Sequence, residues 1–301
     1  MASLADTLGA SRSAVWLEVG PPRGINPEPL LKRLAEFVGH VDAINLTDNS
    51  LGRVKMSALV FASFVKARLG LPVVLNVSCR HRNRYAIKSD LLGAGAIGID
   101  GIVALAGDPV PKEHPHPNAA VRDLDPFGML AMIGALNCGD TGEGRAPLKM
   151  IPRIYAGAVA NPNREDFDRE IALLERKVKA GAKFVITQPV FQAEPARRFL
   201  AQAKRLSIHA VLGILPVKRA SMADHIKQNL KDLSGARSYF ERYAGMSEAE
   251  ARAFSVRENL ELMKTLAGEV AGFNIMSGGS GTSLAIELAR EFSKWRTHAN
   301  R

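Results

Sequence analysis

Two carboxylates stand where buried, strand-like segments of the chain come to an end. Gly101 to Leu105 is an apolar run without charge, and Asp108 follows it directly after Gly107. Glu18 lies near the end of a similar segment, residues 14–19, which runs into a Gly-Pro-Pro turn. Carboxylates at the carboxyl ends of parallel strands lie where α/β enzymes place their chemistry, and they act there as general acids and bases. The pair makes an enzyme the leading hypothesis.

Polar side chains follow most of the other strand-like segments too. They are Thr47 with Asp48 and Asn49, Asn76 with Ser78, Asn161, Gln188 and Ser277. A single polar residue at the end of a strand usually has no function, because the chain becomes polar wherever a buried strand reaches the surface. A set that includes two carboxylates and a glutamine, brought together on one face of a barrel, indicates a site.

Three further features carry weaker predictions. His114 and His116 lack an evident third ligand, so we expect no metal site. Cys79 has no identifiable base and is expected to be a small buried residue rather than a nucleophile. The Gly/Ser-rich run at 277–282 is either an anion cradle at the start of the last helix or a flexible turn.

The elements that must position these residues alternate between strand-like and helix-like from end to end. The expected strands are 14–19, 42–46, 72–77, 101–105, 152–158, 183–187, 209–214 and 272–276. Amphipathic stretches separate them, among them 30–37, 58–69, 167–180 and 285–295. Eight β/α units without a hairpin predict an α/β protein with a parallel sheet closed into a (β/α)8 TIM barrel.

The whole chain, residues 1–301, is expected to form one barrel domain, because no linker or internal repeat divides it. Two stretches interrupt the alternation. Residues 109–125 form a long proline-rich loop, and 218–268 is too long for one helix, so an extra helix is expected after the seventh strand.

Composition excludes several classes of protein. No apolar stretch approaches the roughly 20 residues of a membrane span, and no secretory signal is evident. The two cysteines are too few for a disulfide framework, so a reducing cytoplasm is expected. The net charge of +10 raises the question of nucleic acid, but the basic residues are interleaved with acids along the helices. We expect no nucleic-acid partner.

Seven ordered motifs resemble the methylenetetrahydrofolate reductase family, and the resemblance spans roughly residues 14–290. The stretches are Leu17 to Arg23, Asn45 to Asn49, Asn76 to Arg80, Ser89 to Ala94, Ala104 to Pro109, Gly157 to Pro162 and Arg176 to Phe191. The closest similarity is to the reductase module found fused to homocysteine methyltransferase domains.

The resemblance implies a TIM barrel that carries FAD and uses NADH or NADPH. The reaction would reduce 5,10-methylenetetrahydrofolate to 5-methyltetrahydrofolate, a step of one-carbon metabolism and methionine biosynthesis. By motif, Glu18 matches the general acid that opens the methylene bridge. Asp108 matches a second catalytic acid, near the flavin, that also orients the pterin, and Gln188 matches the glutamine that contacts the pterin.

The resemblance also implies a set of cofactor-binding residues. Thr47 lies beside the flavin, and Glu170 and Lys177 match positions at the distal part of FAD. The remaining implied FAD contacts, beside Asp108, are Asn76, Ala106, Gly107 and Asn161.

Three positions differ from the pattern of the family. Asn76 replaces a histidine, Ala106 replaces an arginine that several members bring to the flavin, and Ala220 stands where a stacking aromatic is common. Two alternatives therefore stay open beside a flavin-dependent reductase. One is a flavin-independent reductase that takes hydride directly from NAD(P)H. The other is a pterin-binding partner subunit of a larger electron- or methyl-transfer complex. Homo-oligomer formation stays open too.

Overall fold

A computed structural model describes most of the chain. It covers residues 3–110, 113, 120–121, 123–144, 146–229, 236–277 and 282–299. His114, His116 and residues 278–281 lie outside this part of the chain, and so does most of the 109–125 loop. The predictions made for them stay predictions.

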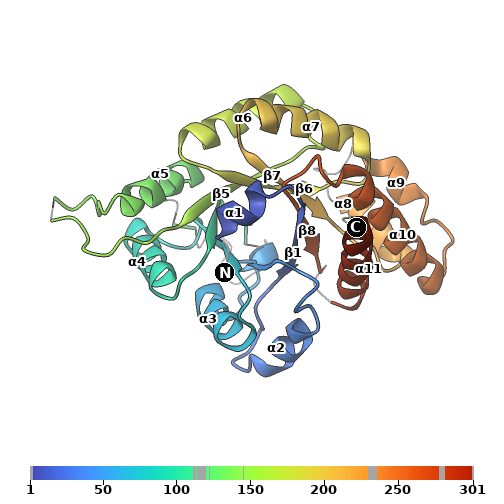
Figure 1. Cartoon of the computed structure of the whole chain (residues 1–301), viewed down its shortest axis with the longest axis horizontal. Coiled ribbons are helices and arrows are strands. Elements are labelled where there is room, and N and C mark those ends of the chain that lie inside the picture. Colours follow the sequence, from blue (N-terminus) through green and yellow to red (C-terminus); the bar gives the residue numbers. More distant parts are fainter. Residues whose placement is uncertain are drawn as a thin grey trace.

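Eight parallel strands close into a barrel in sequence order, β1 pairing with both β2 and β8, which confirms the predicted fold (Figure 1). The strands are β1 (Ala14–Val19), β2 (Ala43–Leu46), β3 (Val73–Ser78), β4 (Gly101–Leu105), β5 (Tyr155–Ala160), β6 (Phe184–Pro189), β7 (His209–Ile214) and β8 (Gly272–Met276). Because all of them are parallel, their carboxyl ends meet on one face of the barrel.

Alternate residues of each strand face opposite sides, as the two-residue period of a strand requires. One set packs in the lumen, where Trp16, Val103 and Phe184 belong to one apolar cluster. The other set packs under the surrounding helices, as Leu17 and Ile102 do. Burial on both sides explains why these strands are continuously apolar in sequence.

Helices surround the barrel. They are α1 (Leu4–Gly9), α2 (Glu28–Ala35), α3 (Ala58–Leu69), α4 (Arg84–Ala96), α5 (Pro126–Asn137), α6 (Phe167–Lys179), α7 (Ala193–Arg205), α8 (Ala220–Asn229), α9 (Arg237–Glu241), α10 (Glu248–Leu266) and α11 (Ser283–Ala299). A 3-10 turn, η1 (Ser50–Gly52), follows β2. Asp166 caps α6 by accepting a hydrogen bond from the Arg169 amide, and Gly181 follows the helix with φ +116°. Local capping of this kind sets where a helix begins and ends.

The fifth strand begins at Tyr155 and not at residue 152, so the predicted start was wrong. The Asn137 side chain explains the difference. Its amide nitrogen donates to the Ile154 carbonyl at 2.8 Å, and its oxygen accepts from the Ile154 amide at 3.0 Å. Both backbone groups of Ile154 are therefore occupied, and Pro152 has no amide hydrogen to offer a neighbouring strand.

The described residues between β7 and β8 form three helices, α8, α9 and α10. One of them is the helix of its β/α unit, so this part of the chain shows two additional helices where one was predicted. They enclose a second apolar cluster built around Tyr239, Phe240, Tyr243 and Phe254. This separate core explains why the stretch is longer than one barrel helix.

The amino end of the barrel is covered by α1. Leu4 and Leu8 pack into the same cluster as Trp16 and Phe184, and Figure 1 shows α1 across the ring of strands. A capping box between Ser3 and Asp6 holds the first turn of α1. The carboxyl end is therefore the face on which a substrate could reach the lumen. Within the described residues, every helix is too short or too polar to span a membrane.

Candidate functional site

Glu18 lies at the carboxyl end of β1 and points into the lumen, two residues above Trp16. Its Oε2 accepts a hydrogen bond from Asn274 Nδ2 at 2.8 Å and one from Asn45 Nδ2 at 3.3 Å. Burial raises the pKa of Glu18 above its ordinary value, although the Asn274 hydrogen bond and the Lys55 charge oppose this rise. A carboxyl group of this kind can hold a proton and give it up, as a general acid must.

Lys55, in the segment between β2 and α3, brings a positive charge toward Glu18. Its side chain lies over Gly20, where an added Cβ would clash with Nζ. Its Nζ also lies 3.4 Å from the Ser50 hydroxyl. Burial lowers the pKa of Lys55, and the charges of Arg53 and Arg23 lower it further, whereas Glu18 raises it. The mouth of the barrel is thus positively charged beside its buried acid.

Thr47 and Asp108 meet the same segment, which connects β2 to α3. Thr47 Oγ1 lies 3.5 Å from the Ser50 hydroxyl. Asp108 is exposed, and its Oδ2 accepts a hydrogen bond from the Leu51 amide at 2.6 Å. Glycine is required just before Asp108, because Gly107 has φ +88° and an added Cβ would lie 2.4 Å from the Ser78 hydroxyl. The turn after β4 thereby directs Asp108 toward the β2–α3 segment.

Asp48 anchors the start of this segment. Its carboxylate accepts two hydrogen bonds from the Arg82 guanidinium, at 2.9 and 3.1 Å, and one from the Ser78 amide at 3.0 Å. A paired arginine and a backbone amide hold the carboxylate at three points. Asp48 therefore positions the start of the β2–α3 segment.

Asn76, Gln188 and Asn161 occupy the carboxyl ends of β3, β6 and β5. The Asn76 side chain is largely buried and the Gln188 side chain is exposed, and neither amide has a hydrogen-bond partner among the described residues. The Asn161 oxygen instead accepts from the Asn163 amide at 3.0 Å. The amides of Asn76 and Gln188 are thus available to a ligand at this end of the barrel.

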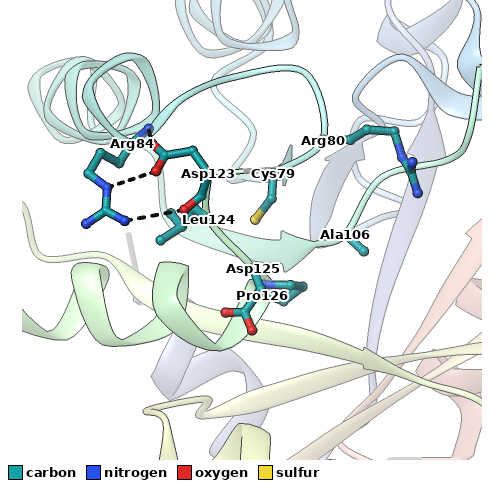
Figure 2. A pocket seen from close by; sticks show the side chains of 8 residues that line it. All are labelled: Cys79, Arg80, Arg84, Ala106, Asp123, Leu124, Asp125 and Pro126. Carbon is teal, nitrogen blue, oxygen red and sulfur yellow. Dashed lines mark hydrogen bonds and ion pairs between the residues drawn. The ribbon is translucent and has the colours of Figure 1, made fainter. Parts of the chain in front are cut away.

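A cavity of about 590 Å³ opens beside β3 and β4 and includes Ala106 (Figure 2). Cys79, Arg80, Arg84, Asp123, Leu124, Asp125 and Pro126 complete its lining. Arg84 is paired with Asp123 at 3.2 Å, and Arg80 Nε donates to the Gly107 carbonyl at 3.0 Å. Burial raises the pKa of the Cys79 thiol to about 12, which makes it a poor nucleophile.

Glu170 and Lys177, the residues expected at the distal part of FAD, make internal contacts. Lys177 Nζ donates to the Val159 carbonyl at 2.7 Å. Glu170 is buried, accepts from the Asn161 amide at 2.9 Å and pairs with Arg164 at 3.1 Å. One of the three donors of the Lys177 ammonium is therefore used within the protein, and Glu170 is engaged by an amide and a guanidinium. The role of both residues at FAD stays a prediction.

Most of the predicted site residues lie at or near the carboxyl end, whereas Lys177 lies in the last turn of α6 and contacts β5 through its side chain. The structure joins only some of them. Thr47 and Asp108 share the β2–α3 segment, and Lys55 links that segment to Glu18. Sequence reasoning missed Asn45, Asn274 and Lys55 as site residues. The signal for the two asparagines was a single amide inside each of two apolar strands, β2 and β8, at a lumen-facing position.

Two curated relatives are similar in sequence. One, from Caenorhabditis elegans, is named a probable methylenetetrahydrofolate reductase (NADPH) and is 27% identical over 216 residues. That alignment covers 67% of this chain and 30% of the nematode protein, so the chain spans less than a third of its length. The other, 5,10-methylenetetrahydrofolate reductase of Pectobacterium carotovorum subsp. carotovorum, is 27% identical over 71% of this chain and 67% of its own length.

Solved structures share the fold at low sequence identity. A Clostridium thermocellum protein, described as binding two copies of 5-methyl-5,6,7,8-tetrahydrofolic acid, superposes with a TM-score of 0.65 at 16% identity. The match covers 97% of this chain and 98% of that protein. The sequence pattern of the methylenetetrahydrofolate reductase family matches residues 3–273. The chain therefore belongs to the methylenetetrahydrofolate reductase family.

Proposed function

We propose that this protein reduces 5,10-methylenetetrahydrofolate to 5-methyltetrahydrofolate by hydride transfer, with Glu18 as the general acid. One observation carries the proposal: a buried carboxyl with a raised pKa stands at the open mouth of the barrel and is held by two amides. Family membership points to the same reaction. The folate named for the C. thermocellum neighbour is the product that this reaction would form.

The chemistry requires a proton at the methylene bridge before hydride can arrive. The bond between the methylene carbon and one bridge amine breaks, and the electron pair stays on that amine, which takes the proton of Glu18. The other amine forms a carbon–nitrogen double bond, and this iminium carbon accepts the hydride. A carboxyl with a raised pKa keeps this proton to a higher pH than a solvated carboxyl does, and can therefore supply it.

The other residues at the mouth would bind and orient the pterin. The Gln188 amide is exposed and makes no hydrogen bond with a described residue, so it can donate to and accept from a heterocycle. Asp108 keeps Oδ1 for a pterin N–H group while Oδ2 accepts from the Leu51 amide. We propose that Gln188 and Asp108 both bind the substrate and that Asp108 also takes part in catalysis.

The hydride could reach the substrate in two ways, through bound FAD or directly from NADH or NADPH. When bound, FAD would relay hydride from NADH or NADPH to the substrate. Glu170 and Lys177 make internal contacts, however, and Ala106 offers no guanidinium to the cavity that it lines. These observations favour the second candidate, a reductase that takes hydride directly from NADH or NADPH.

One set of measurements tests both candidates. Purified protein is titrated with FAD while its absorption spectrum is recorded. Turnover of 5,10-methylenetetrahydrofolate is then measured with NADH and with NADPH, with and without FAD. Turnover without bound flavin supports the direct route, and turnover that requires FAD overturns it. Folate binding without turnover under any of these conditions would point instead to a pterin-binding partner subunit.

We also propose that the protein works in the cytoplasm. Cys79 and Cys138 are both free thiols, as is usual in a reducing compartment. Whether copies of the chain associate is a question for light scattering on the purified protein.

A further inference from the structure

We infer that Asn274 and Asn45 assign separate tasks to the two oxygens of Glu18: Oε2 is kept as an acceptor, and Oε1 carries and delivers the proton. This inference deepens the proposed function and rests on it for its catalytic meaning. Neither asparagine belongs to the group of strand-end polar residues from which the site was predicted. Both act on the reaction through Glu18, so they are positioning residues.

The hydrogen bonds at Glu18 are all on one oxygen. Asn274 Nδ2 lies 2.8 Å from Oε2, and Asn45 Nδ2 lies 3.3 Å from the same atom. None of the described residues donates a hydrogen bond to Oε1. An oxygen that already accepts two N–H groups has little remaining capacity to hold a proton, so the proton of the neutral acid resides on Oε1.

The two amides hold each other in the donating orientation. Asn45 Nδ2 also lies 3.3 Å from Asn274 Oδ1 and donates to it. If the Asn274 amide were rotated by half a turn, its NH₂ group would face the NH₂ group of Asn45, and its oxygen would face Glu18 Oε2. Both contacts would be unfavourable with an ionised Glu18. Both side chains are buried, and Asn45 Oδ1 has no hydrogen-bond partner within the part of the chain that the structure describes. A buried oxygen without a hydrogen-bond partner lowers the free energy of unfolding. The orientation that leaves Asn45 Oδ1 unpaired is the one that directs the Asn45 NH₂ group to Glu18.

We call the two hydrogen bonds from Asn274 and Asn45 to Glu18 Oε2 the Oε2 clamp. Closure of the barrel makes this clamp possible. Glu18 lies on β1, which pairs with β2 on one side and with β8 on the other. Asn45 is the register partner of Glu18 on β2, and Asn274 is the partner of Trp16 on β8. The acid is therefore held from both neighbouring strands, which are rigid elements rather than loops. Rigid support of this kind preserves the direction of a proton donor.

The clamp also serves the state after proton transfer. When the Oε1–H bond breaks and the proton moves to the bridge amine, the electron pair stays on the carboxylate. The Asn274 and Asn45 amides then stabilise this charge. Of the charged groups, Lys55 from the β2–α3 segment reaches Glu18, while Arg53 and Arg23 act on Lys55. No charged side chain of β2 or β8 faces Glu18, because Asn45 and Asn274 occupy those positions.

The test measures the titration of Glu18 itself. Protein labelled with ¹³C at its glutamate carboxyl carbons is titrated by NMR, and Glu18→Gln assigns the signal. Asn274→Leu keeps the approximate volume of the side chain and removes its donors. We expect the pKa of Glu18 to rise by about one pH unit, because a hydrogen bond to the ionised form is lost. The alkaline limb of the kcat profile for folate reduction should move with it, and kcat should fall while KM stays near its original value.

A matched control is available elsewhere in the chain. Asn259 in α10 is similarly buried and donates to the Ser255 carbonyl at 2.7 Å, and it is not among the groups that shift the pKa of Glu18. Asn259→Leu should leave the Glu18 titration unchanged. Asn45→Ala, on a different strand, repeats the test with the longer hydrogen bond and should give a smaller rise. It also decides the matter if Asn274→Leu does not fold.

An unchanged Glu18 titration in the folded Asn274 and Asn45 variants would overturn the inference. A shift in pKa without a shift in the kcat profile would overturn the role in catalysis. If the wild-type protein does not reduce the folate at all, the proposed function fails, but the NMR titration still tests the clamp on Oε2.

Discussion

At the scale of single residues, Glu18 illustrates how opposing effects set the protonation of one group. Removal from water favours the neutral acid, while the Asn274 hydrogen bond and the Lys55 ammonium favour the carboxylate. Burial is the largest of these effects, and the pKa is raised. The same lysine has a lowered pKa because burial and two arginines oppose its charge. Glu18 therefore keeps its proton to a higher pH than in water, and Lys55 releases its proton at a lower pH than in water.

Replacing Glu18 by glutamine should remove the transferable proton while keeping the shape of the side chain. We expect the rate of methylenetetrahydrofolate reduction to fall by about 10²–10⁴-fold, the usual contribution of a general acid. Stopped-flow measurement of NAD(P)H oxidation gives the rate, and circular dichroism checks the fold. A wild-type rate for Glu18→Gln would show that Glu18 is a structural carboxylate.

The raised pKa of Glu18 also predicts how stability depends on pH. The folded-state pKa lies above the unfolded value near 4.5, so the native protein binds the proton more tightly. The contribution of Glu18 to the free energy of unfolding is fully present below pH 4.5, and it is lost as the pH rises through the folded-state pKa. Urea unfolding across this range should show the loss in the wild type and not in Glu18→Gln.

Glu250 provides the control of opposite sign. Hydrogen bonds from the Ser247 hydroxyl and amide lower its pKa, so its contribution is present above the unfolded value and is lost as the pH falls. The difference between the wild type and Glu250→Gln should therefore grow with rising pH. Two slopes of the same sign would contradict the environment described for Glu18.

At the scale of elements, the segment between β2 and α3 joins the candidate site together. Asp48 fixes its start through Arg82 and the Ser78 amide. The Lys55 amide closes it by donating to the Asn49 side chain at 3.0 Å. Between these points the Leu51 amide holds Asp108. The turn after β4 can reach this segment only because Gly107 leaves room beside Ser78.

Gly107→Ala should therefore disturb both stability and the site. Alanine at φ +88° costs roughly 1–2 kcal/mol, and the new Cβ would push against Ser78. Gly142→Ala is a matched control, since Gly142 has φ +69° and nothing within 4 Å of an added Cβ. Urea unfolding should show a loss in both variants that is larger at Gly107. Weaker folate binding is expected only for Gly107→Ala, and equal binding by both would contradict the described role of the turn.

At the scale of the whole molecule, the barrel is closed at one end and charged on its outside. The α1 helix covers the amino end, which leaves the carboxyl end for ligands. The net charge is +10, yet many basic side chains on the surface pair with acids from other elements. Arg197 with Glu269, Arg205 with Glu175 and Arg242 with Glu258 are examples.

This distribution predicts that duplex DNA is not a specific partner. A basic side chain that pairs with a carboxylate has less positive charge to offer to a phosphate backbone. Fluorescence anisotropy with a labelled duplex at physiological salt should show no submicromolar binding, because tight binding requires many phosphate contacts at once. Submicromolar affinity with a steep salt dependence would contradict the expectation.

Much of the architecture could be predicted because it depends on local patterns. Apolar runs of strand length, separated by amphipathic helices, predict a parallel barrel, and a barrel brings strand ends to one face whatever the details of packing. Glu18 and Asp108 were found in this way. The start of β5 was missed because the Asn137 side chain, distant in sequence, occupies the backbone of Ile154.

The tertiary structure alone decided which groups meet. Asn274 donates to Glu18 across 256 residues of sequence, through a contact that exists only because β8 closes on β1. Lys177 contacts the Val159 carbonyl, and Glu170 contacts Asn161 and Arg164, partners that the motif match did not indicate. The sequence by itself determined the barrel and its reactive end, since strand period and helix amphipathicity are local. The partners of each polar group depend on side chains from distant strands and helices, and these become neighbours only when the ring is closed.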